Sequence, residues 1–311
     1  MKPLRVLLGP TAVGKTSASL PLAEALNAEI VCIDSRQIYR GMEIGSAAPT
    51  REERARVPHH LVAEVEPEDA MSAGEFGRRA RAAIDAIRDR DREALLVGGS
   101  GLYLRAVLGG LDEGLPRDAA LRESLRARAR TEGVDALHAE LMRLDPETGA
   151  RTSPRDAQRV TRALEVIALT GRPVSALRTR GRRTETPARI VVLDRDRADL
   201  ETRIRARVAS MIDAGLVDEV RALLSRGLDP HTPVLRSVGY AETIRFLAGD
   251  LDRAAWIEAI AVNTRRYAKR QRTWFRSLEG VTWIHAGPED PDDALNARLL
   301  SAWSADESGR R

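Results

Sequence analysis

Cysteine is nearly absent from this sequence of 311 residues, in which Cys32 stands alone. A single cysteine excludes a disulfide framework within the chain and a zinc site built from several cysteine ligands. Cys32 lies within the apolar run Ile30–Ile33. We therefore expect it to pack in the core of a protein that resides in a reducing compartment, the cytoplasm.

Long apolar runs are also missing. No uninterrupted apolar segment of the sequence approaches the roughly 18 residues that are needed to cross a membrane. The first residues lack the charged and then apolar pattern of a secretory signal. We therefore expect a soluble, cytoplasmic protein with no membrane partner, and a length of 311 residues suggests one large domain or two.

Lysine is scarce, and its positions are informative. Lys2, Lys15 and Lys269 are the lysines among 50 basic residues, which leaves 50 − 3 = 47 arginines. Lys15 departs from this preference within GPTAVGKT, residues 9–16, a segment that satisfies the pattern G-x-x-x-x-G-K-[ST]. We call this segment the glycine loop. A compact ammonium at Lys15 suits the chemistry of a phosphate better than a planar guanidinium.

The sequence around the glycine loop predicts a phosphate-binding turn between a strand and a helix. The apolar run 4–8 predicts a buried strand, and residues 17–28 have apolar positions at helical spacing. Loop amides and the helix N-terminus would converge on phosphate oxygens, Lys15 would reach the distal phosphate, and the Thr16 hydroxyl would hold Mg²⁺. The predicted phosphate site comprises Gly9, Pro10, Thr11, Ala12, Val13, Gly14, Lys15 and Thr16.

Two further apolar runs end in polar residues that we expect at the same edge of a sheet. The predicted strand 29–33 is followed by Asp34, and the predicted strand 93–97 leads through two glycines to Ser100. Ligands of open α/β sheets bind at the carboxyl ends of the strands. The glycine loop, Asp34 and Ser100 therefore form a candidate site.

The order of the predicted elements indicates an α/β fold. Strands are also predicted at 58–63, 190–193 and 281–284, and helices at 72–90 and 199–224. Together with the strand, loop and helix at the start of the chain, these elements predict a P-loop core that resembles nucleotide kinases and contains a mostly parallel sheet.

The segment 116–185 differs from the rest of the chain in pattern and in charge. Apolar residues recur at helical spacing from 118 to about 180, so we expect an all-helical insertion into a core made of 1–115 and 186–311. The insertion holds 15 arginines and 10 acidic residues, a charge of 15 − 10 = +5, whereas the whole chain has a net charge of +4. This excess fits a polyanionic partner, and it equally fits a solvated arginine-rich face.

Eight segments of the chain resemble, in the same order, the tRNA dimethylallyltransferase family, also called the tRNA isopentenyltransferases. They are GPTAVGKT (9–16), DSRQIYRGMEIGSAAP (34–49), PHH (58–60), SAGEF (72–76), LLVGGSGLY (95–103), RDAQRVTRALEV (155–166), LRSVGY (235–240) and TRRYAKRQRTWFR (264–276). A glycine loop alone occurs in many unrelated proteins, whereas this ordered set is specific. The zinc finger of eukaryotic members is not found, which suggests a bacterial-type enzyme.

The resemblance implies a reaction and roles for the candidate site. A dimethylallyl group would pass from dimethylallyl diphosphate to N6 of the adenosine on the 3′ side of the tRNA anticodon, position 37. The glycine loop and Arg236 would hold the diphosphate, while Lys15 and Mg²⁺ would stabilise it as a leaving group. Asp34 is similar to the catalytic aspartate of the family, and Ser100 stands where the family has a threonine.

The resemblance also implies a surface for the tRNA anticodon stem-loop, and we expect a monomer to bind it. The matching residues are Asp34, Ser35, Arg36, Gln37, Ile38, Ser100, Arg122, Gln158, Arg159, Val160, Thr161 and Arg162. Ala48 departs from the family, which commonly has a lysine there. Any phosphate or tRNA contact of that lysine would here have to come from a neighbouring arginine.

Other functions stay open at this level. A small-molecule kinase or NTPase would bind ATP in the same loop, with Asp34 holding Mg²⁺ or contacting the substrate. An isopentenyltransferase that acts on free adenine nucleotides would share the chemistry but would have no use for the basic insertion. A non-catalytic RNA-binding protein would use the loop as a nucleotide sensor.

Overall fold

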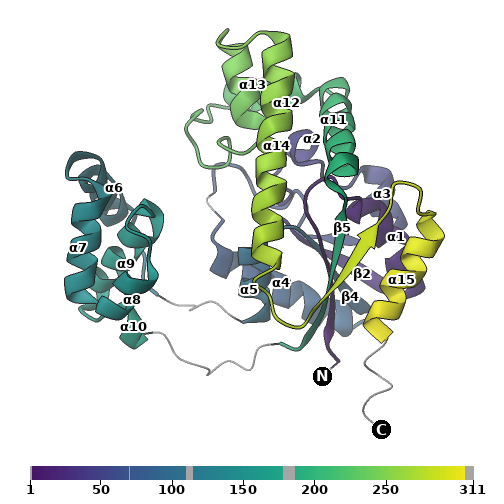
Figure 1. Cartoon of the computed structure of the whole chain (residues 1–311), viewed down its shortest axis with the longest axis horizontal. Coiled ribbons are helices and arrows are strands. Elements are labelled where there is room, and N and C mark those ends of the chain that lie inside the picture. The colour runs from purple at the N-terminus through teal and green to yellow at the C-terminus, as the bar shows by residue number, and fades with distance from the viewer. Residues whose placement is uncertain (1, 70, 110–114, 178–185, 305–311) are drawn as a thin grey trace. The chain divides into compact units, whose positions relative to one another are not determined.

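The computed structural model of the chain describes residues 2–69, 71–109, 115–177 and 186–304 (Figure 1). The chain divides into two compact units. The sheet unit consists of residues 1–109 and 185–311, and the helical unit consists of residues 110–184. Among the residues that the structure describes, no helix combines the length and the apolar character needed to cross a membrane.

The described part of the sheet unit contains a six-stranded sheet in which every neighbouring pair is parallel, with the order β3-β2-β4-β1-β5-β6. Its strands are β1 (Leu4–Leu8), β2 (Ala28–Ile33), β3 (His59–His60), β4 (Glu93–Gly98), β5 (Ala188–Arg195) and β6 (Val281–Ala286). β2 is buried along its whole length, and β4 is buried except at its first residue. Such continuous burial is typical of a parallel sheet covered on both faces.

The strand β1 lies inside the sheet, between β4 and β5. Leu8 pairs with Gly98 on one side and with Val192 on the other. Ile33, the last residue of β2, also pairs with Gly98. The carboxyl ends of β2, β4 and β1 are therefore level, and the loops that follow these strands leave the sheet at one edge.

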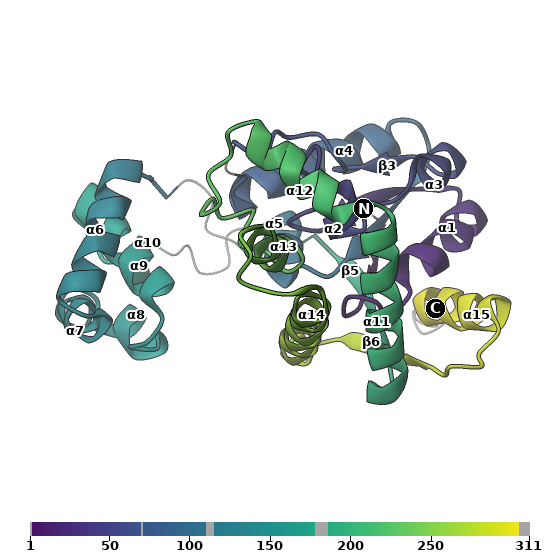
Figure 2. The same ribbon diagram turned by 90° about the horizontal axis from the view of Figure 1, so that it is seen from above.

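Ten helices of the sheet unit lie in its described residues. They are α1 (Lys15–Ala25), α2 (Glu43–Ser46), α3 (Arg51–Arg56), α4 (Ala73–Arg88), α5 (Gly101–Leu108), α11 (Arg197–Asp213), α12 (Leu216–Ser225), α13 (Tyr240–Leu247), α14 (Arg253–Phe275) and α15 (Asp292–Ser304). α1 and α15 pack against each other and against strands, and α4 packs against α5, β2 and β4. α11, α12 and α13 stand above the carboxyl ends of the strands (Figures 1 and 2).

Three predicted elements of the sheet unit need correction. The single helix predicted at 199–224 is two helices, because Gly215 has a φ of +99° between α11 and α12. The strand predicted at 58–63 shrinks to β3, since Leu61 and Ala63 have positive φ angles that end an extended strand. The helix α15 was not predicted from the sequence at all.

The helical unit has its own core. Its helices are α6 (Ala119–Thr131), α7 (Val134–Leu144), α8 (Pro146–Arg151), α9 (Ala157–Thr170) and α10 (Val174–Leu177), and no strand occurs among residues 115–177. Leu125, Leu137, Leu141 and Leu164 are among the buried side chains of this core. Asp118 and Asp156 begin α6 and α9 with side chains that accept a hydrogen bond from a backbone N–H, which is the usual way to cap a helix.

Candidate active site

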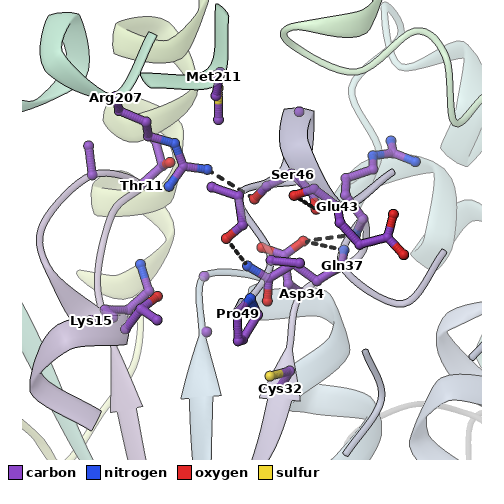
Figure 3. A pocket seen from close by; sticks show the side chains of 18 of the residues that line it. Thr11, Lys15, Cys32, Asp34, Gln37, Glu43, Ser46, Pro49, Arg207 and Met211 are labelled. Carbon is purple, nitrogen blue, oxygen red and sulfur yellow. Dashed lines mark hydrogen bonds between the residues drawn. The ribbon is translucent and has the colours of Figure 1, made fainter. Parts of the chain in front are cut away.

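A cavity of about 1280 Å³ lies at the carboxyl edge of the sheet (Figure 3). Its walls come from the glycine loop, the turn 34–37, the segment 43–51, and the helices α11 and α14. Lys15, Asp34 and Arg207 line it together with small and apolar side chains such as Ala48 and Met211. The cavity therefore offers both charged groups and an apolar surface to one ligand.

The backbone of the glycine loop requires both glycines of its pattern. Gly14 precedes α1 with a φ of +100°, a left-handed conformation that favours glycine. A Cβ atom at Gly9 would lie only 2.6 Å from the carbonyl oxygen of Leu193 in β5. The loop thus passes close to the sheet and ends at the N-terminus of α1, where bound anions are favoured.

Lys15 is folded back onto the glycine loop. Its ammonium donates hydrogen bonds to the carbonyl oxygens of Gly9, at 2.9 Å, and Pro10, at 2.8 Å. Burial and, to a smaller extent, the Arg207 guanidinium lower the pKa of Lys15 to about 7, and the opposing effect of Asp34 is smaller still. An anion in the loop would favour the charged ammonium and raise this pKa.

Arg195 braces the far end of the glycine loop from β5. This arginine is only 5% exposed, and its Nε atom donates to the carbonyl oxygen of Val13 at 2.9 Å. Its Nη1 atom donates to Asp199 at 2.8 Å and to the carbonyl oxygen of Gly287 at 2.9 Å. Through these contacts, Arg195 supports the loop.

Asp34 follows β2 directly and forms its own turn. Its Oδ1 atom accepts hydrogen bonds from the backbone N–H groups of Arg36, at 2.8 Å, and Gln37, at 3.4 Å (Figure 3). The Gln37 side chain donates to the carbonyl oxygen of Ala47 at 3.0 Å. Both hydrogen bonds to Asp34 use Oδ1. Because Asp34 lines the cavity, its other carboxylate oxygen, Oδ2, is left to contact a bound ligand.

Arg207 is a residue of the cavity that the sequence analysis missed. It donates to the carbonyl oxygen of Ser46 at 3.0 Å (Figure 3). Burial lowers its pKa, and Asp34 partly offsets that effect. Arg203 and Met211, each four residues away on α11, also line the cavity. The helical spacing of these residues places them on one face of α11, but the sequence does not show that this face meets the cavity.

The segment that carries Ala48 is held by Glu219 of α12. Its carboxylate accepts hydrogen bonds from the backbone N–H groups of Ile44, at 2.7 Å, and Gly45, at 2.8 Å. The Tyr240 hydroxyl lies 2.8 Å from Glu219 Oε1. Burial raises the pKa of Glu219, whereas these hydrogen bonds act in the opposite direction. Glu219 and Tyr240 thus fix α2 and the wall of the cavity next to it.

Ser100 and Arg236 occupy different places relative to the cavity. Ser100 immediately precedes α5, and its backbone N–H donates to the carbonyl oxygen of Ile33 at 3.2 Å. This bond brings Ser100 to the end of β2, where Ile33 directly precedes Asp34. Ser100 itself is not one of the residues that form the cavity wall. Arg236 is exposed and does line the cavity.

The candidate tRNA residues of the helical unit fall into three groups. Arg122 and Arg162 each lie 2.8 Å from the fully buried carboxylate of Glu165. Gln158 and Arg159 are exposed, and the Arg159 side chain is 73% exposed. The third group, Val160 and Thr161, has side chains that are buried within the helical unit.

The described residues contain no group of three or more histidine, cysteine, aspartate or glutamate side chains that could hold a metal ion. Thr16 and Asp34 both line the cavity and offer oxygen atoms. Mg²⁺ commonly takes one or two protein ligands and completes its coordination with water and substrate phosphates. The residues present therefore fit a metal ion that enters with a phosphorylated substrate.

A parallel sheet with a glycine loop, a carboxylate and arginines around one cavity at its carboxyl edge defines an α/β protein suited to an anionic substrate. The family model of the IPP transferases matches residues 37–278. The chain belongs to the IPP transferase family and is a transferase.

Relatives and solved structures agree with this assignment. The chain is 44% identical to tRNA dimethylallyltransferase 1 of Trichlorobacter lovleyi over 293 residues, or 93% of this chain and 96% of the relative. It is 48% identical to the tRNA dimethylallyltransferase of Methylibium petroleiphilum over 297 residues, or 93% of this chain and 90% of the relative. The family resemblance seen in the sequence is therefore confirmed.

Two crystal structures share the fold. The tRNA isopentenylpyrophosphate transferase from Bacillus halodurans has a TM-score of 0.72 and 36% identity, with 99% of each chain covered. A eukaryotic dimethylallyltransferase acting on tRNA has a TM-score of 0.84 and 25% identity, with 100% of this chain and 80% of that chain covered. The predicted α/β fold with a mostly parallel sheet is confirmed.

Proposed function

We propose that this enzyme transfers the dimethylallyl group of dimethylallyl diphosphate to N6 of adenosine 37 in tRNA. One observation carries the proposal: Asp34, which follows β2, and Lys15, in the loop that follows β1, line one cavity that also has an apolar wall. The transfer reaction requires a base beside the attacking amine and a cation beside the leaving group. The tRNA dimethylallyltransferases among its relatives support the same reaction.

In the proposed reaction, Asp34 acts as the general base. The lone pair of N6 is delocalised into the adenine ring, so this amine is a poor nucleophile unless its proton is removed. N6 attacks the allylic carbon, the bond from this carbon to the diphosphate oxygen breaks, and the N6 proton passes to the carboxylate of Asp34. The turn of residues 34–37 fixes that carboxylate through Oδ1.

The glycine loop would hold the diphosphate as it leaves. The leaving group gains negative charge as the carbon–oxygen bond breaks, and the Lys15 ammonium and the loop amides would stabilise it. Lys15 must first exchange its carbonyl partners, Gly9 and Pro10, for phosphate oxygens. Arg236 would bind the same group from the loop between α12 and α13.

Mg²⁺ is the metal that we propose for this site. Thr16 would hold it together with oxygen atoms of the diphosphate, and the ion would neutralise part of the charge of the leaving group. Thr16 stands at the start of α1, beside Lys15. The chain's own residues would still bind and orient both substrates.

We further propose that tRNA binds through the turn 34–37, the Ser100 segment and the arginines of the helical unit. The charge of +5 within residues 116–185 and the exposure of Arg159 support this role. The target base of an anticodon loop is single-stranded, so its extrusion into a cavity costs little. We also propose that the enzyme is a monomer and acts in the cytoplasm.

The test is to incubate the protein with Mg²⁺ and labelled dimethylallyl diphosphate, without ATP, and to offer tRNA and AMP in parallel. A tRNA with guanosine at position 37 serves as the matched control, because it lacks the N6 amine. We expect label in the unaltered tRNA alone. Label in AMP would favour the enzyme of free nucleotides, a requirement for ATP would favour a kinase, and binding of tRNA without transfer would favour an RNA-binding protein.

A further inference from the structure

Gln271 of α14 joins two segments of the candidate active site. Its Oε1 atom accepts a hydrogen bond from the backbone N–H of Thr11 at 2.9 Å, and its Nε2 atom donates to the carbonyl oxygen of Gly99 at 2.9 Å. Thr11 belongs to the glycine loop, and Gly99 directly precedes Ser100. A carboxamide presents a donor and an acceptor at one end, so it can satisfy both backbone groups at once.

Gln271 is nearly buried where α14 borders the cavity. Gln271 is 6% exposed, which shields both hydrogen bonds from water and strengthens them. A Cβ atom at Gly99 would lie 2.2 Å from Gln271 Nε2. Glycine at position 99 therefore lets the carboxamide approach the backbone, and the spacing of the two segments depends on this contact.

The next residue of α14 reinforces the same loop by another route. Arg272 donates to Asp194 Oδ1 at 2.7 Å and also to the carbonyl oxygen of Arg195. Arg195 in turn donates to the carbonyl oxygen of Val13 at 2.9 Å. Consecutive residues of α14 thus hold the glycine loop at Thr11 directly and at Val13 through β5. The helix α14 also packs against α5, which begins after Ser100.

We propose that Gln271 is a positioning residue for the transfer reaction, which fixes the spacing between the glycine loop and the Ser100 segment. This inference rests on the proposed function, in which the loop holds the leaving group and the Ser100 segment binds the tRNA. Small displacements of groups that hold two reactants reduce the rate of reaction more than they reduce binding. Gln271 touches neither substrate in this proposal and acts through Thr11 and Gly99.

The first test is the substitution Gln271→Leu, which has similar size and neither hydrogen bond. We expect the single-turnover rate with saturating tRNA and dimethylallyl diphosphate to fall about 10- to 100-fold. The dissociation constant for tRNA should stay within about 3-fold of the parent value, because the tRNA surface is unchanged. Trp303→Phe is the control for lost stability, since buried Trp303 donates to the carbonyl oxygen of Arg189 at 3.1 Å and lines no part of the cavity.

The second test is Gln271→Glu, which separates positioning from simple stabilisation of α14. The introduced carboxyl can donate to the carbonyl oxygen of Gly99 only when it is protonated, and burial favours that form. The ratio of the variant rate to the parent rate should therefore rise as the pH is lowered, and this readout decides the matter even if Gln271→Leu does not fold.

Three outcomes overturn one or the other proposal. A folded Gln271→Leu variant with a parental transfer rate overturns the inference, and so does a rate ratio for Gln271→Glu that does not change with pH. Absence of transfer by the parent protein would overturn the proposed function itself, whereas an active parent with unaffected variants contradicts only the role of Gln271.

Discussion

At the residue scale, the charge of Lys15 controls how the glycine loop binds an anion. Its pKa of about 7 means that the ammonium loses its proton near neutral pH in the free protein. An anion in the loop raises this pKa, so binding above pH 7 requires the uptake of a proton. The affinity for the anion therefore decreases as the pH rises above about 7.

We predict that the dissociation constant for inorganic diphosphate, measured by calorimetry at constant Mg²⁺, increases between pH 7 and pH 9, with a limiting slope of about tenfold per pH unit. Lys15→Ala should remove the part of this slope that comes from the protein and lower the transfer rate by about 10²-fold or more. Equal pH slopes in the parent and the variant would contradict the role of Lys15.

The role of Asp34 distinguishes a transferase from an NTPase, because its carboxylate acts as a general base in the first and as a Mg²⁺ ligand in the second. Asp34→Asn keeps one acceptor oxygen for the N–H groups of Arg36 and Gln37, so the turn should survive. We predict affinities for tRNA and dimethylallyl diphosphate within a few-fold of the parent. The single-turnover rate should fall by about 10²-fold or more, as expected for loss of a general base.

A metal-binding role would give another pattern in the same Asp34→Asn variant. Mg²⁺-dependent affinity for dimethylallyl diphosphate would then fall together with the rate. Rapid-quench measurements of transfer, combined with equilibrium binding at several Mg²⁺ concentrations, distinguish the two. Transfer at the parental rate would exclude Asp34 as the base.

Lys15 and Asp34 could be found from the sequence, whereas Arg207 and Gln271 could not. The first two follow a strand in a short local pattern whose geometry is fixed within a few residues. The roles of the other two depend on how α11 and α14 pack onto loops that are far away in the chain, such as Ser46 for Arg207 and Thr11 for Gln271. A single sequence contains no record of that packing.

At the scale of elements, the short helix α2 depends on residues outside it. Four residues form too short a helix to be stable alone, and Glu219 satisfies two of its N-terminal N–H groups. The Tyr240 ring also fills the space beside Gly45, where a Cβ atom would lie 2.5 Å away. α2 is therefore fixed by the partners that α12 and α13 supply.

We predict that Tyr240→Phe lowers the free energy of unfolding by about 1 to 2 kcal/mol, because it removes a hydroxyl that lies 2.8 Å from both the carbonyl oxygen of Met42 and Glu219 Oε1. It should also raise the Michaelis constant for dimethylallyl diphosphate, since the wall formed by 43–49 loosens. Tyr39→Phe is the matched control: buried Tyr39 accepts one hydrogen bond from Met71 and does not line the cavity.

Urea unfolding and steady-state kinetics of both variants test this prediction. Similar losses of stability with a changed Michaelis constant only in Tyr240→Phe would support the role of α2. Equal Michaelis constants for dimethylallyl diphosphate in the two variants would contradict the role of α2.

Element boundaries were predictable where the periodicity was clear and failed where single residues decide them. The strand, loop and helix of residues 4–25 agree with the expected order. The break at Gly215 depends on one positive φ angle within a continuous helical pattern. α15 was missed because its packing on β5, β6 and α1 is a long-range feature.

At the scale of the whole molecule, the basic charge of the helical unit should govern tRNA binding. Arg159 is the best single test, because its side chain is 73% exposed and pairs only at the surface with Asp156, at 3.3 Å. Arg162 is a poor test, since it donates to buried Glu165 and to the carbonyl oxygen of Pro116. Its removal would leave a buried charge poorly compensated and destabilise the fold.

We predict that tRNA affinity decreases steeply with salt concentration, and that Arg159→Ala weakens tRNA binding and reduces the salt slope by about 1. Arg221→Ala is the matched control, because exposed Arg221 pairs with Asp218, also three residues away, and does not line the cavity. Filter binding at several salt concentrations measures the tRNA affinity and the salt slope of each variant. A slope equal to that of the control variant would remove Arg159 from the tRNA surface.

The central position of β1 has a consequence for the synthesis of the chain. One neighbour of β1, the strand β4, ends at Gly98, and the other, β5, begins at Ala188, so 188 − 98 = 90 positions separate them. At the usual pace of a ribosome, these residues take about 5 to 20 s to appear. During that interval the helical unit can complete its local contacts, while one edge of β1 stays open to wrong partners. The nascent chain therefore carries one unpaired edge of β1 until β5, which ends at Arg195, has emerged.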